Sequence, residues 1–121
     1  MGKLTILVVD DDREILSSFM HILSEGGYGV ETAETGHEAI EKCKRGSHDL
    51  ALLDIKLPDM DGTQLLEQLQ GIDPKMRTIM VTGYARLDAA LRALILQANA
   101  YVQKPVDPDE LLKVVSATLN E

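Results

Sequence analysis

The stretch LTILVVDDD, residues 4–12, joins a short apolar run directly to three consecutive aspartates. Leu4 to Val9 is continuous and rich in β-branched residues, which is typical of a strand buried on both faces of a sheet. A second apolar run, Asp49 to Ile55, carries Asp54 near its end. Two buried strands that finish on carboxylates indicate a parallel sheet whose carboxyl edge bears polar groups.

Outward from these two runs, apolar segments alternate with amphipathic ones along the whole chain. Further strands are predicted over residues 29–32, 78–82 and 100–103. Helical spacing of apolar residues predicts helices over residues 15–23, 39–43, 65–69 and 87–94, with a last helix from Asp107. Five strands alternating with five helices predict a flavodoxin-like (βα)5 fold. This is an α/β doubly wound parallel sheet with strand order 2-1-3-4-5, in a single domain.

Two helix starts carry recognisable capping patterns. Thr35 followed by Glu38 predicts a capping box, in which each side chain bonds the backbone of the other residue. Asp107 with Pro108 and Glu110 predicts a second start, with a side-chain cap, proline in the first turn and a glutamate to complete the box.

Composition limits the classes of function. The 121 residues, 45% of them hydrophobic, suit one soluble domain spanning residues 1–121 with no effector domain. The net charge of −8 argues against direct nucleic-acid binding, because neutralising phosphates needs clustered Lys and Arg. No apolar run reaches the roughly 20 residues of a membrane helix. Cys43 is the only cysteine, which agrees with a reducing, cytoplasmic setting.

The ends of the predicted strands carry the chemistry. Asp10, Asp11 and Asp12 follow the first strand, and Asp54 closes the third, which neighbours the first in this strand order. Carboxylates about 5 Å apart repel by on the order of 3 kcal/mol at an effective dielectric of 20, so such a site needs a cation. Oxygen ligands without Cys or His favour Mg²⁺, with Mn²⁺ as a substitute. Lys104, after the fifth strand, is the cation that the chain itself offers.

Four segments resemble the signature segments of the bacterial two-component response-regulator receiver domain. They are LTILVVDDD, DLALLDIKLPDMDG, TIMVTGYA and AYVQKPVDPDEL, in order and at matching separations over essentially the whole chain. The resemblance implies that Asp54 accepts a phosphoryl group. It also implies that Asp10 and Asp11 hold Mg²⁺, Asp11 directly and Asp10 largely through water, with the backbone carbonyl of Lys56 as a further ligand.

The same resemblance assigns roles beyond the metal. Thr82 and Lys104 match the hydroxyl and the ammonium that bind the phosphoryl group, and Tyr101 matches the aromatic residue whose rotamer follows Thr82. The side chains of Lys56 and Tyr84 are expected to flank the path of the hydrolytic water and to tune the lifetime of the phosphate. The Lys104-Pro105 bond is expected to be cis, as is usual in this family.

The resemblance also implies partners. The phosphoryl donor is expected to be a histidine kinase or a phosphotransfer protein. The output surface is expected to be made by the helix over 87–94, the strand over 100–103 and the last helix. Apolar Ile95 lies where the family commonly has a polar residue, which indicates either a homodimer or docking surface or an incidental exposed aliphatic. Thr82-Gly83-Tyr84 resembles receivers attached to transcription activators.

Alternatives exist for the function and for single residues. A metal-dependent aspartyl phosphatase would want an acid where Lys56 stands, and a flavodoxin-like carrier would want a Ser/Thr/Gly-rich loop after the first strand. Turnover catalysis is therefore not expected. Asp12 is interpreted as a helix cap and Cys43 as a core residue. The histidines are expected to be solvated, and the loop from Asp59 to Gly62 lacks the remaining ligands of a calcium loop.

Overall fold

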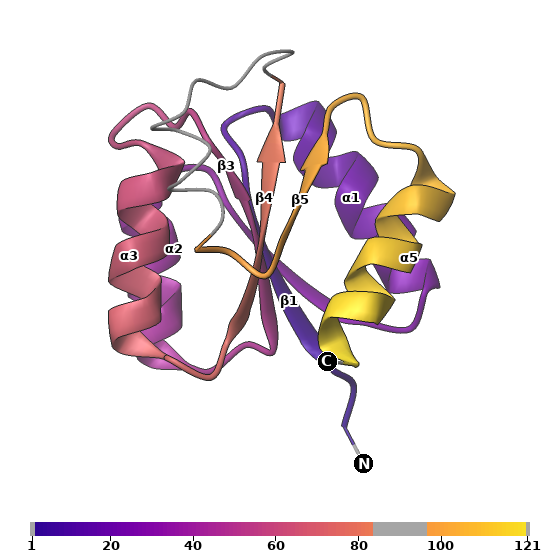
Figure 1. Ribbon diagram of the computed structural model, residues 1–121, viewed down its shortest axis with the longest axis horizontal. Coiled ribbons are helices and arrows are strands. Elements are labelled where there is room, and N and C mark those ends of the chain that lie inside the picture. The colour runs from indigo at the N-terminus through magenta and orange to yellow at the C-terminus, as the bar shows by residue number, and fades with distance from the viewer. Residues whose placement is uncertain (1, 84–96, 121) are drawn as a thin grey trace.

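Five parallel strands form one sheet in the predicted order, β2-β1-β3-β4-β5, in the computed structural model (Figure 1). The structure describes residues 2–83 and 97–120. The strands are β1 Thr5–Val9, β2 Gly29–Ala33, β3 Leu50–Asp54, β4 Arg77–Thr82 and β5 Ala100–Gln103. Residues 6–9 of β1 and 50–53 of β3 are buried and apolar without alternation, as predicted for strands covered on both faces.

Four helices lie in the described residues, and the predicted helix over 87–94 lies outside them. They are α1 Arg13–Glu25, α2 Gly36–Arg45, α3 Gly62–Ile72 and α5 Pro108–Leu119. Asp12 caps α1 as predicted, since its side chain accepts a hydrogen bond from the backbone N–H of Glu14.

Of the two predicted capping boxes, the one at Thr35 is half formed, and the side-chain cap predicted at Asp107 is not made. Thr35 caps α2 by accepting from the N–H of Glu38, at 3.0 Å, but the Glu38 carboxylate accepts from the N–H of Glu34 instead of Thr35. Asp107 stands at the N-cap of α5 with Pro108 in the first turn, yet its side chain makes no capping hydrogen bond. The sequence pattern therefore locates both helix starts but overstates the side-chain bonds made there.

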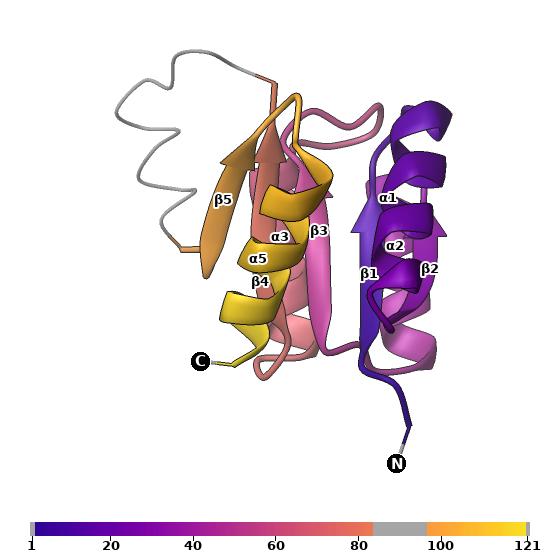
Figure 2. The same ribbon diagram turned by 90° about the vertical axis from the view of Figure 1, so that its right-hand side faces the viewer.

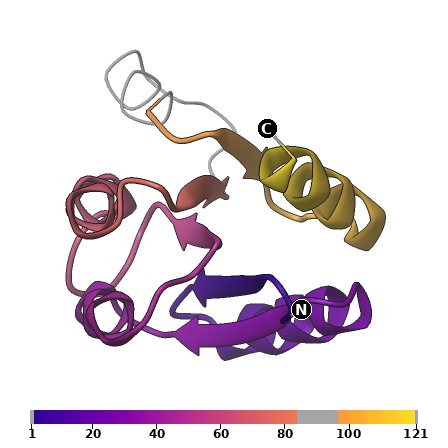
Figure 3. The ribbon, with the colours of Figure 1, turned by 90° about the horizontal axis from the view of Figure 1, so that it is seen from below.

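Helices cover both faces of the sheet. Figures 2 and 3 show α1 and α5 together on one side of the strands and α2 and α3 on the other. Each layer has its own core. Leu65, Leu66 and Leu69 of α3 pack with Leu7 and Leu53, and a second cluster joins α1 and α5 to the sheet through Leu16, Phe19, Leu23, Leu111 and Val115.

Strand register brings the two acidic strand ends to the same level. Val9 of β1 pairs with Leu53 of β3, so Asp10 and Asp54 are the next residues along two neighbouring strands. Asp54 in turn pairs with Val81 of β4, one residue before Thr82. The sheet therefore presents Asp10, Asp54 and Thr82 at one edge.

Burial agrees with the prediction for the cysteine and differs from it for one histidine. Cys43 is buried, as predicted, and burial raises the pKa of its thiol to about 11. The prediction that the histidines are solvated is wrong for His48, which is 7% exposed with its Nε2 2.6 Å from Glu31.

None of the helices in the described part of the chain is long and apolar enough to span a membrane.

Candidate metal centre and phosphoryl-acceptor site

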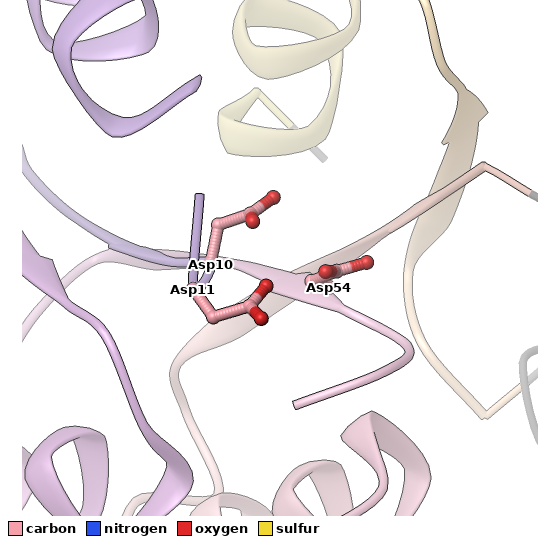
Figure 4. Close-up of side chains that lie close together, drawn as sticks. All are labelled: Asp10, Asp11 and Asp54. Atoms are coloured by element: carbon pink, nitrogen blue, oxygen red, sulfur yellow. The ribbon is translucent and has the colours of Figure 1, made fainter. Parts of the chain in front are cut away.

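Three carboxylates converge at the carboxyl edge of the sheet. Figure 4 shows Asp10 and Asp11, which follow β1, projecting into the same space as Asp54 at the end of β3. One oxygen from each residue lies within 4.8 Å of the others. Asp10 and Asp54 are buried and Asp11 is exposed, so the cluster opens to solvent on the Asp11 side. The predicted convergence of the two strand ends is confirmed.

Lys104 faces this cluster from the loop after β5. Its Nζ lies 2.8 Å from Asp10 Oδ2 and 3.5 Å from Asp54 Oδ1. Its backbone N–H donates to the carbonyl of Thr82, at 2.7 Å, and the Lys104-Pro105 peptide is cis, as the resemblance implied. Burial alone would lower the pKa of Lys104, but its hydrogen bond to Asp10 and the charges of Asp10 and Asp54 raise it. The ammonium therefore stays charged at neutral pH.

The surroundings of Asp54 disfavour the charged form of its carboxyl group. Burial and the charge of Asp10 raise the pKa of its carboxyl above the ordinary value, while Lys104 and the backbone N–H of Lys56 oppose this. Because the balance is upward, ionising Asp54 costs free energy in the folded protein. A divalent cation bound there would offset this cost, because an opposite charge nearby favours the ionised carboxylate.

The donor set fits Mg²⁺. All three converging side chains offer carboxylate oxygen, which Mg²⁺ prefers, and neither His nor Cys is part of the cluster found in the described residues. Asp10 is held in place because it accepts from the backbone N–H of Asp12, at 2.9 Å, and from Lys104. Lys56, two residues after Asp54, lies beside the cluster, because its backbone N–H bonds the Asp54 carboxylate. It also forms an isolated β-bridge with Asp61.

The other predicted residues are placed as follows. Thr82 is buried at the end of β4. Tyr101 pairs with Met80 across β4 and β5, and the residue is 54% exposed. Tyr84 and Ile95 lie outside the described residues.

Two residues of the site's surroundings were missed by the sequence analysis, Asp59 and Gly62. Asp59 hydrogen-bonds to the N-terminus of α2, and Gly62 lies against the backbone of Asp54. The Pro-Asp-Met-Asp-Gly composition indicated a loop, but nothing local in it indicates either contact.

A groove of about 550 Å³ beside Lys104 is lined by Ile15 and Phe19 of α1 and by Val106.

Replacing Asp54 by Asn is expected to stabilise the metal-free protein. A raised pKa means that the folded state binds the proton more tightly than the unfolded state does, so stability falls as pH rises from 3.8 through the raised value. At pH 7.5 that loss is complete, and Asn removes it. We expect the melting temperature in EDTA to rise by more than about 1 °C in thermal unfolding followed by circular dichroism.

The matched control is Asp109→Asn on the exposed first turn of α5, which is expected to leave the melting temperature within about 1 °C. At a pH below 3.8 the advantage of Asp54→Asn should vanish. A lower melting temperature for Asp54→Asn at pH 7.5 would show that the ion pair with Lys104 outweighs the burial and repulsion described above.

The comparisons with known proteins agree with this geometry. The family model "Response regulator receiver domain" matches residues 6–116. A response regulator receiver domain protein (CheY-like) from Methanospirillum hungatei JF-1 is 45% identical, with a TM-score of 0.93 over 98% of this chain and 95% of that chain.

Curated relatives are longer transcriptional regulators. "Transcriptional regulatory protein ZraR" of Salmonella typhimurium is 32% identical over 98% of this chain and 27% of its own length. "Alginate biosynthesis transcriptional regulatory protein AlgB" of Pseudomonas putida is 37% identical over 88% of this chain and 24% of its length. The chain thus spans about a quarter of the curated relatives that it matches. Strand order, the acidic edge and the family match together establish that the chain belongs to the receiver domains of two-component response regulators.

Proposed function

We propose that this receiver is a phosphorylation-activated switch in which Asp54 accepts the phosphoryl group in a Mg²⁺-dependent reaction. The observation that supports this is the convergence of Asp10, Asp11 and Asp54 within 4.8 Å, with Lys104 Nζ 3.5 Å from Asp54. Asp10, Asp11, Asp54 and the backbone carbonyl of Lys56 would hold the ion. Bound Mg²⁺, or Mn²⁺ in its place, would neutralise charge on the transferred phosphoryl group.

The chain's own residues would carry out the transfer. A carboxylate oxygen of Asp54 attacks phosphorus, the bond from phosphorus to the donor nitrogen breaks, and the leaving imidazole is protonated from solvent. The Lys104 ammonium then faces the new phosphoryl oxygens, and the Thr82 hydroxyl donates to one of them. Attack by water on phosphorus later returns the carboxylate and releases phosphate, and Lys56 and Tyr84 tune that rate. The protein is a switch that is reset in this way and not a turnover enzyme.

The output would follow from a shift between two conformations. Moving an equilibrium from 1:99 to 99:1 takes about 5.5 kcal/mol of differential stabilisation. A phosphoryl group bonded to Thr82 and Lys104 would supply charge-assisted bonds of that order in one conformation only. Tyr101 is exposed on β5, two residues before Gln103, which pairs with Thr82. Tyr101 and Ile95 would report the change on the surface made by residues 87–94, β5 and α5.

The partners follow from the same proposal. A histidine kinase or a phosphotransfer protein would donate the phosphoryl group in the cytoplasm, and the output surface would serve a homodimer. ZraR and AlgB are named transcriptional regulators, which supports a transcription-activating output for a longer protein containing this receiver. The net charge of −8 argues against direct contact between this chain and nucleic acid.

Incubation with acetyl phosphate tests the proposal directly. We expect Mg²⁺ to allow the transfer of one phosphoryl group per chain, detected by intact-protein mass spectrometry, and EDTA to abolish it. Mapping of the acyl phosphate by peptide mass spectrometry should place it on Asp54. Continuous release of phosphate without a labelled protein would instead support a phosphatase, and labelling that is unaffected by EDTA would rule out the proposed metal dependence.

A further inference from the structure

The loop between β3 and α3 is fastened to a helix that is remote in sequence. Asp59 lies in this loop, three residues after Lys56, and its Oδ1 accepts from the backbone N–H of Gly36, at 2.9 Å. Its Oδ2 accepts from the backbone N–H of His37, also at 2.9 Å, and contacts the His37 ring. One carboxylate thus binds two consecutive N–H groups at the start of α2.

These bonds complete the N-terminus of α2. The first N–H groups of a helix have no partner within the helix. Thr35 satisfies the N–H of Glu38, and Asp59 satisfies those of Gly36 and His37. The positive end of the helix dipole also favours a carboxylate there. Desolvation would raise the pKa of Asp59, but the N–H groups of His37 and Gly36 and the His37 ring lower it to about 2, so it is ionised at neutral pH.

A close steric contact supports the same attachment. A Cβ atom on Gly36 would lie 2.5 Å from the sulfur and 2.6 Å from Cγ of Met60. Met60 packs against the core cluster that includes α2 and α3. A side chain at position 36 would therefore require the Met60 side chain to shift. Two adjacent loop residues, Asp59 and Met60, therefore contact the same helix turn.

The other end of this loop lies at the metal centre. The backbone N–H of Lys56 donates to the Asp54 carboxylate. Lys56 also forms a β-bridge with Asp61, and the N–H of Gly62 donates to the carbonyl of Ile55, at 2.6 Å. The segment between Lys56 and Asp61 is thus a short closed loop, and Asp59 near its tip joins it to α2. Movement at the tip would therefore be transmitted to the backbone of Lys56.

We propose that Asp59 is a positioning residue of the metal centre, which holds the β3–α3 loop on the N-terminus of α2 and so sets the place of the Lys56 carbonyl. The inference rests on the proposed Mg²⁺ site, since Asp59 itself does not reach the converging carboxylates. Residues that orient metal ligands are often worth as much as an order of magnitude in affinity.

The test compares two ways of weakening α2. Asp59→Ala removes the link between loop and helix, whereas Thr35→Ala removes the helix's own cap and leaves the loop contacts in place. Isothermal titration with Mg²⁺ is expected to show binding about 10-fold weaker for Asp59→Ala and within about 2-fold of wild type for Thr35→Ala. Gly36→Ala, which displaces the Met60 side chain but keeps both Asp59 hydrogen bonds, is expected to weaken Mg²⁺ binding by less than Asp59→Ala does. Asp59→Asn keeps one acceptor oxygen and should fall between Asp59→Ala and wild type.

A second measurement does not depend on the ion. Hydrogen exchange of the Lys56 amide in the metal-free protein should be at least about 10-fold faster in Asp59→Ala and unchanged in Thr35→Ala, because only the former frees the loop. Equal effects of the two variants, or wild-type affinity and exchange in Asp59→Ala, would overturn the inference. Wild-type protein that binds no Mg²⁺ would overturn the proposed metal site and with it this role of Asp59, whatever the exchange data show about the loop.

Discussion

Asp54→Asn is expected to lose phosphorylation by acetyl phosphate almost completely, by at least about 100-fold, because an amide is not a nucleophile under these conditions. The variant also removes one of the three converging carboxylates, so Mg²⁺ binding should weaken at the same time. The folded structure should persist, since Asn matches Asp in shape and the metal-free site is relieved of a costly charge. Intact-protein mass spectrometry at fixed times after addition of acetyl phosphate and Mg²⁺ measures the loss.

The control is again Asp109→Asn, which alters one exposed carboxylate of α5 and should be labelled like wild type. A full phosphoryl group on Asp54→Asn would mean that the acceptor is another residue. Asp11 would be the first candidate, because it is the exposed member of the cluster. Lys104 should not be labelled in either case, since its ammonium is held protonated.

Gly62→Ala is expected to destabilise the protein by about 3 kcal/mol or more, which is at the upper end for overpacking. A Cβ atom at position 62 would lie 2.1 Å from the carbonyl oxygen of Asp54 and 2.8 Å from Cα of Ile55. Both are backbone atoms, so neither can rotate away as a side chain would. The N–H of Gly62 is moreover bonded to the carbonyl of Ile55, at 2.6 Å, which holds the two segments together.

Thermal unfolding should show this as a fall of about 10–15 °C in melting temperature. Because the displaced backbone belongs to Asp54, Mg²⁺ binding should weaken in whatever fraction stays folded. Gly71→Ala is the matched control, since it lies in the same helix with nothing within 4 Å of the added methyl. That variant is expected to be neutral or up to about 1 kcal/mol more stable. A melting temperature of Gly62→Ala within about 2 °C of wild type would contradict the steric argument.

Much of the site could be predicted because it depends on where strands end. The apolar runs that contain Val9 and Leu53 are long enough to identify buried parallel strands, and parallel strands present their carboxyl ends at one edge. Asp10, Asp11 and Asp54 follow from that rule and from the strand order. Lys104 and Thr82 needed the resemblance to the receiver family, because a lysine or a threonine after a strand is common.

Side-chain contacts between remote segments could not be predicted in the same way. His48 was expected in solvent, yet it is buried against Glu31 of β2, a strand separated by β1 from the strand that His48 precedes, β3. Glu38 bonds Glu34 and not Thr35, although the local pattern fits a capping box equally well. Such choices depend on three-dimensional neighbours that no short sequence window contains.

The amino-acid sequence alone determined the order of strands and helices and the acidic edge of the sheet, because hydrophobic periodicity and strand-end chemistry are local properties. Only the tertiary structure decided that Asp59 caps a helix 22 residues away and that Gly62 touches the backbone of Asp54. Those contacts arise from packing between segments, where a fraction of an ångström decides whether a side chain fits.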